Sequence, residues 1–178
     1  MDKIGVFCSA ANNLSSAYVD CAKALGTWMG QNHKTLVYGG SYLGLMGEVG
    51  KACHENGGKL FGMVPKSLTE NGWEEPELDI NMPCEGLMDR KDLMILNSDI
   101  MVALPGGVGT LDEVFTAMGM MSLGEIDKKV VFLNINDFWK PVIAFLEDLY
   151  QKGFMRHKPA FYFKVANTVE ELISILEA

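Results

Sequence analysis

One segment of this chain carries the strongest signal, and it reads Leu104-Pro105-Gly106-Gly107-Val108-Gly109-Thr110-Leu111-Asp112-Glu113. The apolar run Ile100–Ala103 precedes it, and apolar residues at helical spacing continue to Met118. This order predicts a strand, a glycine-rich turn and the start of a helix. The first N–H groups of a helix lack intrahelical partners and the helix dipole is positive there, so such a turn favours phosphate. Its glycines allow close approach of a ligand, and Glu113 adds a carboxylate one helical turn further on.

A purely structural interpretation of the same residues is a helix cap. In the pattern Thr110-x-x-Glu113, the threonine would cap the helix and the glutamate would accept from the backbone at the cap. The same pattern occurs at Ser67-x-x-Glu70 and Thr168-x-x-Glu171, where nothing suggests chemistry. The glycine cluster, the preceding strand and a second glycine-rich turn at residues 39–40 favour function for the first of the three.

The composition is that of one globular domain. The chain has 178 residues, of which 48% are hydrophobic and 21% charged, enough to bury a sizeable core. Its net charge of -8 argues against nucleic acid as a partner, because binding that backbone requires a basic surface. No apolar run reaches the roughly 18 residues that span a bilayer, and Met1-Asp2-Lys3 does not open a signal peptide. We therefore expect a cytoplasmic protein with no membrane partner.

Cysteines and histidines are too dispersed to indicate a metal site. No C-x-x-C pair is present and no ligand spacing is visible. We expect reduced thiols and no bound metal. The residues concerned are Cys8, Cys21, Cys53, Cys84, His33, His54 and His157.

Strands and helices alternate along the chain. Short apolar runs predict strands, and apolar residues three and four positions apart predict helices. Residues 66–85 are polar, contain Pro76 and Pro83, and are expected to form a long loop. The expected strands are 4–8, 35–38, 59–64, 99–103 and 129–134, with a short sixth at 161–165. The expected helices are 18–29, 43–55, 86–97, the one after Thr110, 138–153 and 169–176.

This alternation predicts an α/β fold of a single domain covering residues 1–178. We expect a Rossmann-like, doubly wound parallel sheet with helices on both faces and right-handed crossovers. Ligands of such sheets bind beyond the carboxyl ends of the strands. The glycine turns at residues 39–40 and 106–109 both follow strands, so they should be neighbours in space.

Two common nucleotide motifs are absent. The first strand runs into Cys8-Ser9-Ala10-Ala11-Asn12, without the G-x-G-x-x-G of dinucleotide-binding proteins, and no G-x-x-x-x-G-K-[ST] occurs. Both NAD and ATP chemistry are therefore disfavoured, and we expect no cofactor. A mononucleotide site built from two separate turns, with a nearby carboxylate and arginine, fits the residues better.

The signature turn resembles that of a known family. Residues Pro105–Glu113 are similar to the P-G-G-x-G-T-x-x-E signature of the LONELY GUY family of phosphoribohydrolases, whose relatives were once labelled possible lysine decarboxylases. Residues Val37–Gly47 resemble the family's Y-G-G-G-x-x-G-L-M-G, Arg90-Lys91 resembles its R-K pair, and Val6-Phe7-Cys8 agrees at the start. The order of the motifs and the length agree over the whole chain.

The resemblance implies hydrolysis of the N-glycosidic bond of a nucleoside 5′-monophosphate, AMP or an N6-modified AMP, to free base and ribose 5-phosphate. In the family the base is often a prenylated adenine, a cytokinin. Arg90 and Glu113 match the family's catalytic pair. Glu113 would steady the positive charge that develops on the sugar and orient the attacking water, while Arg90 would orient the nucleotide. The residues expected to bind substrate are Gly39, Gly40, Ser41, Gly44, Lys91, Gly106, Gly107, Val108, Gly109, Thr110, Leu111 and Asp112.

The sequence departs from the family pattern at several positions and leaves alternatives open. Ser41 replaces the third glycine of G-G-G, Met88 replaces a histidine, and residues 119–124 replace the family's T-W-x-Q-L-G. These departures leave the natural base open. A second hypothesis is a non-catalytic nucleotide or molybdenum-cofactor carrier, and a third is a pyridoxal-phosphate decarboxylase, which would need a Schiff-base lysine.

A homodimer is also expected, because family members dimerise. The apolar stretch 118–123 exceeds what one helix face needs to pack against a core. A helix buried entirely within one subunit would show the same composition.

Overall fold

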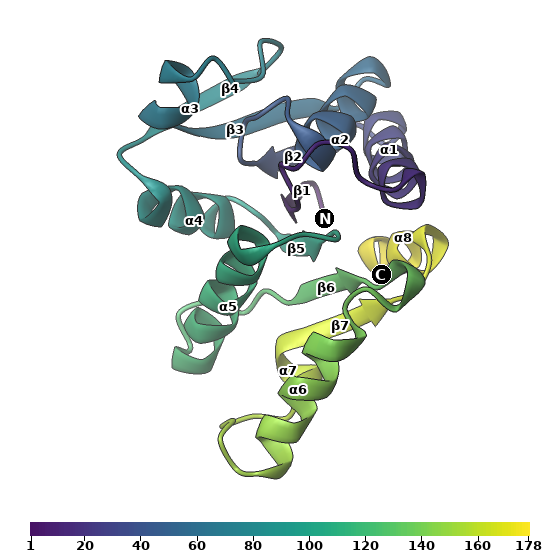
Figure 1. Ribbon diagram of the computed structural model, residues 1–178, viewed down its shortest axis with the longest axis vertical. Coiled ribbons are helices and arrows are strands. Elements are labelled where there is room, and N and C mark those ends of the chain that lie inside the picture. Colours follow the sequence, from purple (N-terminus) through teal and green to yellow (C-terminus); the bar gives the residue numbers. More distant parts are fainter.

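The protein is a seven-stranded parallel sheet covered by helices on both faces (Figure 1). The structure, a computed structural model, describes residues 1–178. The strand order is β4-β3-β2-β1-β5-β6-β7, and every pair is parallel. The strands are β1 Lys3–Phe7, β2 Thr35–Tyr38, β3 Lys59–Pro65, β4 Ile80–Cys84, β5 Ile100–Ala103, β6 Val130–Leu133 and β7 Phe163–Ala166.

The order of the strands reverses at the centre of the sheet. From β1 the chain builds outward to β4 on one side, then returns to place β5 beside β1 and continues to β7 on the other. Loops that leave β1 and β5 therefore separate to opposite faces and open a crevice at the carboxyl ends of these two strands. This confirms the predicted doubly wound fold and locates the crevice where the signature turn lies.

Two groups of helices cover the sheet, and each has its own core. On one face, α1, α2 and α8 bury residues such as Leu25, Val49 and Leu172. On the other face, α4, α5 and α6 bury residues such as Val114 and Leu146. Figure 1 shows the two groups on opposite sides of the strands. The helices are α1 Ser16–Gln31, α2 Gly44–Glu55, α3 Lys66–Glu70, α4 Leu87–Leu96, α5 Val108–Leu123, α6 Lys140–Gln151, α7 Pro159–Tyr162 and α8 Val169–Glu177, with a 3₁₀ turn, η1, at Ile135–Asp137.

The prediction of a long loop at residues 66–85 was wrong in part, because this segment contains helix α3 and strand β4. The β4 sequence, Ile-Asn-Met-Pro-Cys, contains a proline, and only Cys84 of its five residues is buried. Such a strand is compatible only with the edge of a sheet, because proline has no N–H to donate to a second neighbour. β4 indeed lies at the end of the strand order and pairs with β3 alone.

Thr110 is not the N-cap residue of α5, in contrast to the capping pattern considered for Thr110 and Glu113. The helix begins at Val108, with Gly107 at the N-cap position and no side-chain cap. Thr110 therefore lies inside the first turn of the helix. Glu113 does not accept from the backbone N–H of Thr110, as it would in a capping box. By contrast, Thr168 caps α8, where its hydroxyl accepts from the Glu171 N–H.

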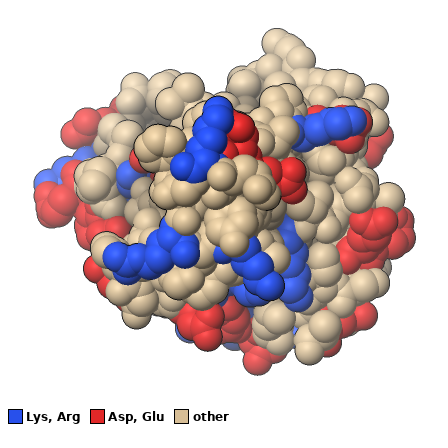
Figure 2. Space-filling view, turned by 90° about the horizontal axis from the view of Figure 1, so that it is seen from below, with Lys and Arg blue, Asp and Glu red and all other residues tan.

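The surface mixes charges of both signs. On the face seen from below in Figure 2, Lys and Arg side chains are interspersed with Asp and Glu and separated by large uncharged areas. No helix combines the length and the hydropathy that crossing a bilayer requires.

Candidate active site

A pocket of about 260 Å³ opens at the carboxyl ends of β1 and β5. It lies at the switch point of the sheet, where ligands of doubly wound folds bind. Residues from β1, the turn after β2, α2, α4 and the signature turn enclose it. They are Val6, Cys8, Ser9, Ala10, Gly39, Met46, Arg90, Met94, Gly107, Gly109, Thr110 and Glu113.

The two glycine-rich turns meet at this pocket, as the sequence predicted. Gly39 and Gly107 both line it. The backbone of Ser9 connects the segments that adjoin the two turns. Its N–H donates to the Pro105 carbonyl at 3.3 Å, and its carbonyl accepts from the Leu45 N–H at 2.9 Å. Three segments far apart in the sequence thus form one wall of the pocket.

The first turn of α5 presents unpaired backbone donors. The first hydrogen bond of the helix runs from the Leu111 N–H to the Gly107 carbonyl, at 3.0 Å. The N–H groups of Val108, Gly109 and Thr110 have no partner within the protein. A Cβ at Gly107 or Gly109 would enter open space, so the glycines leave room for a ligand. Free amides at the positive end of a sixteen-residue helix form an anion site.

Arg90 reaches the pocket from α4 and is held on one side only. Its Nη2 donates to the Gly39 carbonyl at 3.0 Å and lies 3.7 Å from the Met46 Sδ. Its buried Nε has no partner. A Cβ at Gly39 would lie 1.5 Å from the Arg90 Nη2, so only glycine at this position admits the guanidinium. Arg90 therefore keeps donors free for a ligand.

Glu113 faces the same pocket without a partner. No hydrogen bond or ion pair within 4.0 Å involves its carboxylate, and Arg90 is not paired with it. Burial raises the pKa of Glu113 from 4.5 to about 7, while the charge of Arg90 opposes the rise. A carboxyl group with a pKa near neutrality can exchange protons during catalysis.

Lys91 and Asp112 form an ion pair beside the pocket rather than in its lining. The Lys91 Nζ lies 2.8 Å from both carboxylate oxygens of Asp112. The lysine is buried, with 8% of its side chain exposed, whereas 55% of the Asp112 side chain is exposed. The pair connects α4 to α5.

The second glycine turn contributes less to the pocket than the sequence suggested. Gly40 and Ser41 do not line it, and Gly44 lines a different groove. Ser41 is fully buried, and its hydroxyl donates to the Trp73 carbonyl at 2.8 Å and accepts from the Leu43 N–H at 3.2 Å. This hydroxyl secures the segment that precedes β4, so the structure gives it a packing role.

The remaining predicted residues support the turn instead of lining the pocket. Gly106 packs against the buried Thr110, because a Cβ there would lie 2.1 Å from the Thr110 Oγ1. Val108 is 84% exposed and points to solvent. Leu111 packs against the core of the α4–α5 face.

The sequence did not single out several lining residues. Cys8, Ser9 and Ala10 follow β1, and Met46 and Met94 come from helices. The central position of β1, beside the signature strand, was the signal that could have found the first three. The helical methionines carry no such signal, because their role depends on how the helices pack. Cys8 is buried, and this raises the pKa of its thiol well above the usual range, so it stays protonated.

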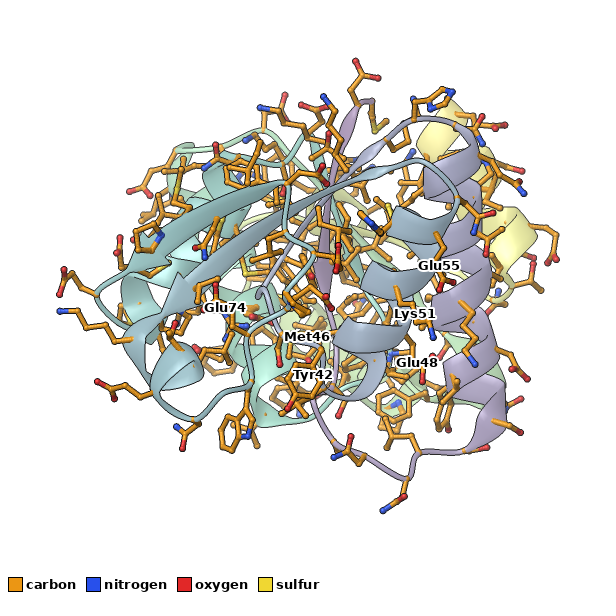
Figure 3. The ribbon with its side chains drawn as sticks, turned by 90° about the horizontal axis from the view of Figure 1, so that it is seen from above. Tyr42, Met46, Glu48, Lys51, Glu55 and Glu74 are labelled. Carbon is orange, nitrogen blue, oxygen red and sulfur yellow. The ribbon has the colours of Figure 1, made fainter.

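A larger groove, of about 850 Å³, lies around α2. Figure 3 shows Glu48, Lys51 and Glu55 along the side of α2 that faces α1, while Tyr42 and Met46 lie at the start of that helix. Four charged groups of this groove pair among themselves: Lys23 with Glu48 at 3.5 Å and Lys51 with Glu55 at 3.9 Å. Both lysines that line the groove are therefore already paired with a carboxylate.

Comparisons with known proteins agree with this architecture. The profile of a family described as "Possible lysine decarboxylase" matches residues 46–176. A cytokinin riboside 5′-monophosphate phosphoribohydrolase of Arabidopsis thaliana is 33% identical over 175 residues, which cover 98% of this chain and 81% of that protein. This chain belongs to the LONELY GUY family.

Other relatives of this LONELY GUY protein show the same pattern. A probable cytokinin riboside 5′-monophosphate phosphoribohydrolase of Oryza sativa subsp. japonica is 33% identical over 98% of this chain and 72% of its own length. Among solved structures, the molybdenum-cofactor (Moco) carrier protein of Chlamydomonas reinhardtii superposes with a TM-score of 0.77 at 25% identity, over 99% of this chain and 95% of that chain. The fold is therefore shared by proteins whose names indicate an enzyme and a carrier.

Proposed function

We propose that this LONELY GUY protein hydrolyses the N-glycosidic bond of a nucleoside 5′-monophosphate, AMP or an N6-modified AMP, and releases free base and ribose 5-phosphate. One observation carries the proposal: a carboxylate and a guanidinium, Glu113 and Arg90, face one pocket without pairing with each other. Relatives at 33% identity are named for this reaction. The unpaired side chains give it a chemical basis in this chain.

The 5′-phosphate would bind at the start of α5. The free N–H groups of Val108, Gly109 and Thr110 supply donors there, and the helix dipole adds a favourable field. A sugar phosphate anchored at this point extends into the pocket toward Glu113, one helical turn further along α5. Binding the phosphate thus fixes the sugar relative to the carboxylate.

Glu113 acts on the sugar and on water. As the bond from the anomeric carbon to the base nitrogen breaks, its electron pair leaves with the base and positive charge develops on the ribose. The Glu113 carboxylate stabilises this charge and accepts a proton from the attacking water, whose oxygen forms the new bond to the anomeric carbon. Arg90 orients the nucleotide through its free donors, and the proton that Glu113 took from water passes to the departing base, which restores the carboxylate.

Two alternatives fit the structure less well. A carrier would use the phosphate turn but would give no role to the unpaired, half-buried carboxylate of Glu113, whose desolvation is costly to maintain. A pyridoxal-phosphate decarboxylase needs a lysine amine in the pocket. The pocket lining includes no lysine, and Lys91 is bound to Asp112.

We also propose that two copies pair through α4 and α5. Met118 and Met121, from the stretch that suggested a dimer, are buried in the core of one subunit. However, Met88 on α4 and Phe115 and Leu123 on α5 remain exposed. An apolar surface of this kind is typical of a protein interface. Sedimentation should give a dimer for the wild type and a monomer for Phe115→Glu/Leu123→Glu.

Base release tests the main proposal. Purified protein is incubated with AMP, other nucleoside monophosphates, and adenosine, and free base is separated by chromatography. We expect adenine from AMP and almost none from adenosine, which lacks the phosphate. Arg90→Ala should lose most of the activity while the circular dichroism spectrum stays unchanged. Stable binding of AMP with no release of base would support the carrier instead.

A further inference from the structure

The ion pair between Lys91 and Asp112 occupies a special position in the chain. Lys91 directly follows Arg90, and Asp112 directly precedes Glu113. The Lys91 Nζ lies 2.8 Å from each carboxylate oxygen, so one ammonium group is shared by both oxygens of Asp112. One contact between α4 and α5 therefore links the immediate neighbours of the two residues that face the pocket.

We propose that Lys91 and Asp112 are positioning residues: their ion pair holds Arg90 and Glu113 at a fixed separation across the pocket, and neither side chain binds the substrate. This inference rests on the proposed function, since it concerns how that site is assembled. It revises the expectation, drawn from the sequence, that both residues bind the nucleotide.

The placement of the pair supports this role. Neither residue lines the pocket, and the buried Lys91 ammonium has an ionic partner already. To reach a phosphate, Lys91 would have to break this pair, in which its ammonium is already neutralised at 2.8 Å. Arg90, one position earlier, reaches the opposite way to the Gly39 carbonyl. Two consecutive residues of α4 thus hold this helix in place: Arg90 bonds to the turn after β2, and Lys91 bonds to α5.

The pair also balances the charges that surround Glu113. The charged groups that act on it are Arg90 and Lys91 from α4 and Asp112 from its own helix. The Cys8 thiol, which lines the same pocket at the end of β1, is neutral. Asp112 raises the pKa of Glu113, and Lys91 lowers it. While the pair is intact these influences oppose each other. Removing one partner leaves the influence of the other uncompensated.

Two single variants therefore have opposite effects on the pH profile. Lys91→Met leaves the Asp112 charge alone, so the acidic limb of the kcat profile for AMP should move to higher pH. Asp112→Asn leaves the Lys91 charge alone, so the limb should move to lower pH. Each shift should be about one pH unit. A merely structural defect would not move the limb in opposite directions.

Steady-state kinetics separate positioning from binding. For Lys91→Met at pH 7 we expect kcat to fall about tenfold or more while KM for AMP changes less than about twofold. Lys91→Arg, which keeps the charge, should retain most of the kcat. Lys152→Met is the matched control, because it removes an exposed pair with Asp148 at 2.7 Å and should change neither parameter.

Several outcomes overturn the proposal. A tenfold rise in KM at unchanged kcat for Lys91→Met would show that the lysine binds substrate. Unaltered kinetics in both variants, or limbs that move in the same direction, would also contradict it. If Lys91→Met does not fold, Lys91→Gln, which also removes the charge, and Asp112→Asn carry the same test.

A second readout distinguishes this inference from the proposed function. Carbon NMR titration of the Glu113 carboxyl group in the free protein measures its pKa without any turnover. The opposite shifts in Lys91→Met and Asp112→Asn should appear there too. If the wild type releases no base from AMP, the proposed function fails, whereas the titration still decides whether the pair controls Glu113.

Discussion

Two segments of this protein share the pattern Thr-x-x-Glu but use it differently. At the start of α8, the Thr168 hydroxyl accepts from the Glu171 N–H at 3.2 Å, and the Glu171 carboxylate accepts from the Asn167 N–H at 2.7 Å. At the start of α5, Thr110 is buried in the first turn and Glu113 has no partner. One glutamate completes a cap, and the other is left free beside a pocket.

The position where each helix begins explains the difference. α8 begins directly after Thr168, so its hydroxyl can reach the free amides. α5 begins at Val108, after Gly107, which has no side chain to offer. The amides of that turn stay unpaired and are available to a phosphate. A capping pattern thus becomes a binding site when glycines move the start of the helix ahead of the threonine.

The largest effect should come from exchanging each glutamate for glutamine. Glu113→Gln removes the carboxylate that acts on the sugar, so base release from AMP should fall by about 10²–10⁴-fold. Glu171→Gln should leave turnover unchanged, because that residue only caps α8. Chromatographic assays of base release by both variants check this. Near-normal turnover by Glu113→Gln would show that Glu113 has no more role in the reaction than Glu171.

A smaller but still large effect is expected at Gly39. Gly39→Ala places a Cβ 1.5 Å from the Arg90 Nη2, so the guanidinium must leave its site. We expect kcat to fall by about 10²-fold, since misplaced groups lose catalytic orientation. Gly119→Ala, in open space on α5, is the control and should be as active as the wild type. Equal activity of both variants would show that Arg90 needs no fixed position.

The free glutamate also predicts a pH dependence that the capping glutamate does not. The pKa of Glu113 in the free protein is about 7 and its ionised form is active, so kcat/KM should rise about tenfold from pH 6 to pH 8. The residual activity of Glu113→Gln should lack this limb. A flat profile in the wild type would contradict the role of the carboxylate.

Stability should respond to pH in the opposite sense. Because the folded state raises the pKa of Glu113 above its usual 4.5, ionisation weakens folding as the pH rises through 7. Relative to the wild type, Glu113→Gln should gain up to about 3 kcal/mol in free energy of unfolding between pH 4 and pH 8. Urea denaturation at both pH values measures this. If the difference in free energy of unfolding between Glu113→Gln and the wild type is the same at both pH values, Glu113 has an ordinary pKa.

The smallest effect belongs to the cap itself. Thr168→Ala removes the hydroxyl that accepts from the Glu171 N–H and should lower the free energy of unfolding by about 1 kcal/mol. Turnover should not change, because α8 lies on the face of the sheet away from α4 and α5. A loss of activity in this variant would show that the two segments are coupled.

The sequence was sufficient to predict the doubly wound fold and the meeting of the two glycine turns, because alternating strands and helices fix the edge at which turns gather. It did not reveal β4, whose Asn81 and Pro83 resemble a loop and which forms only by pairing with β3. It also could not show that the Ser41 hydroxyl is committed to the Trp73 carbonyl. Contacts of that kind depend on tertiary packing, which local patterns do not encode.

The most direct test of this account is a crystal structure of Glu113→Gln with AMP bound. The account predicts the 5′-phosphate on the N–H groups of residues 108–110, with the side chain of residue 113 beside the anomeric carbon of the ribose. A nucleotide seated in the groove around α2, or bound at α5 with its ribose turned away from residue 113, would contradict it.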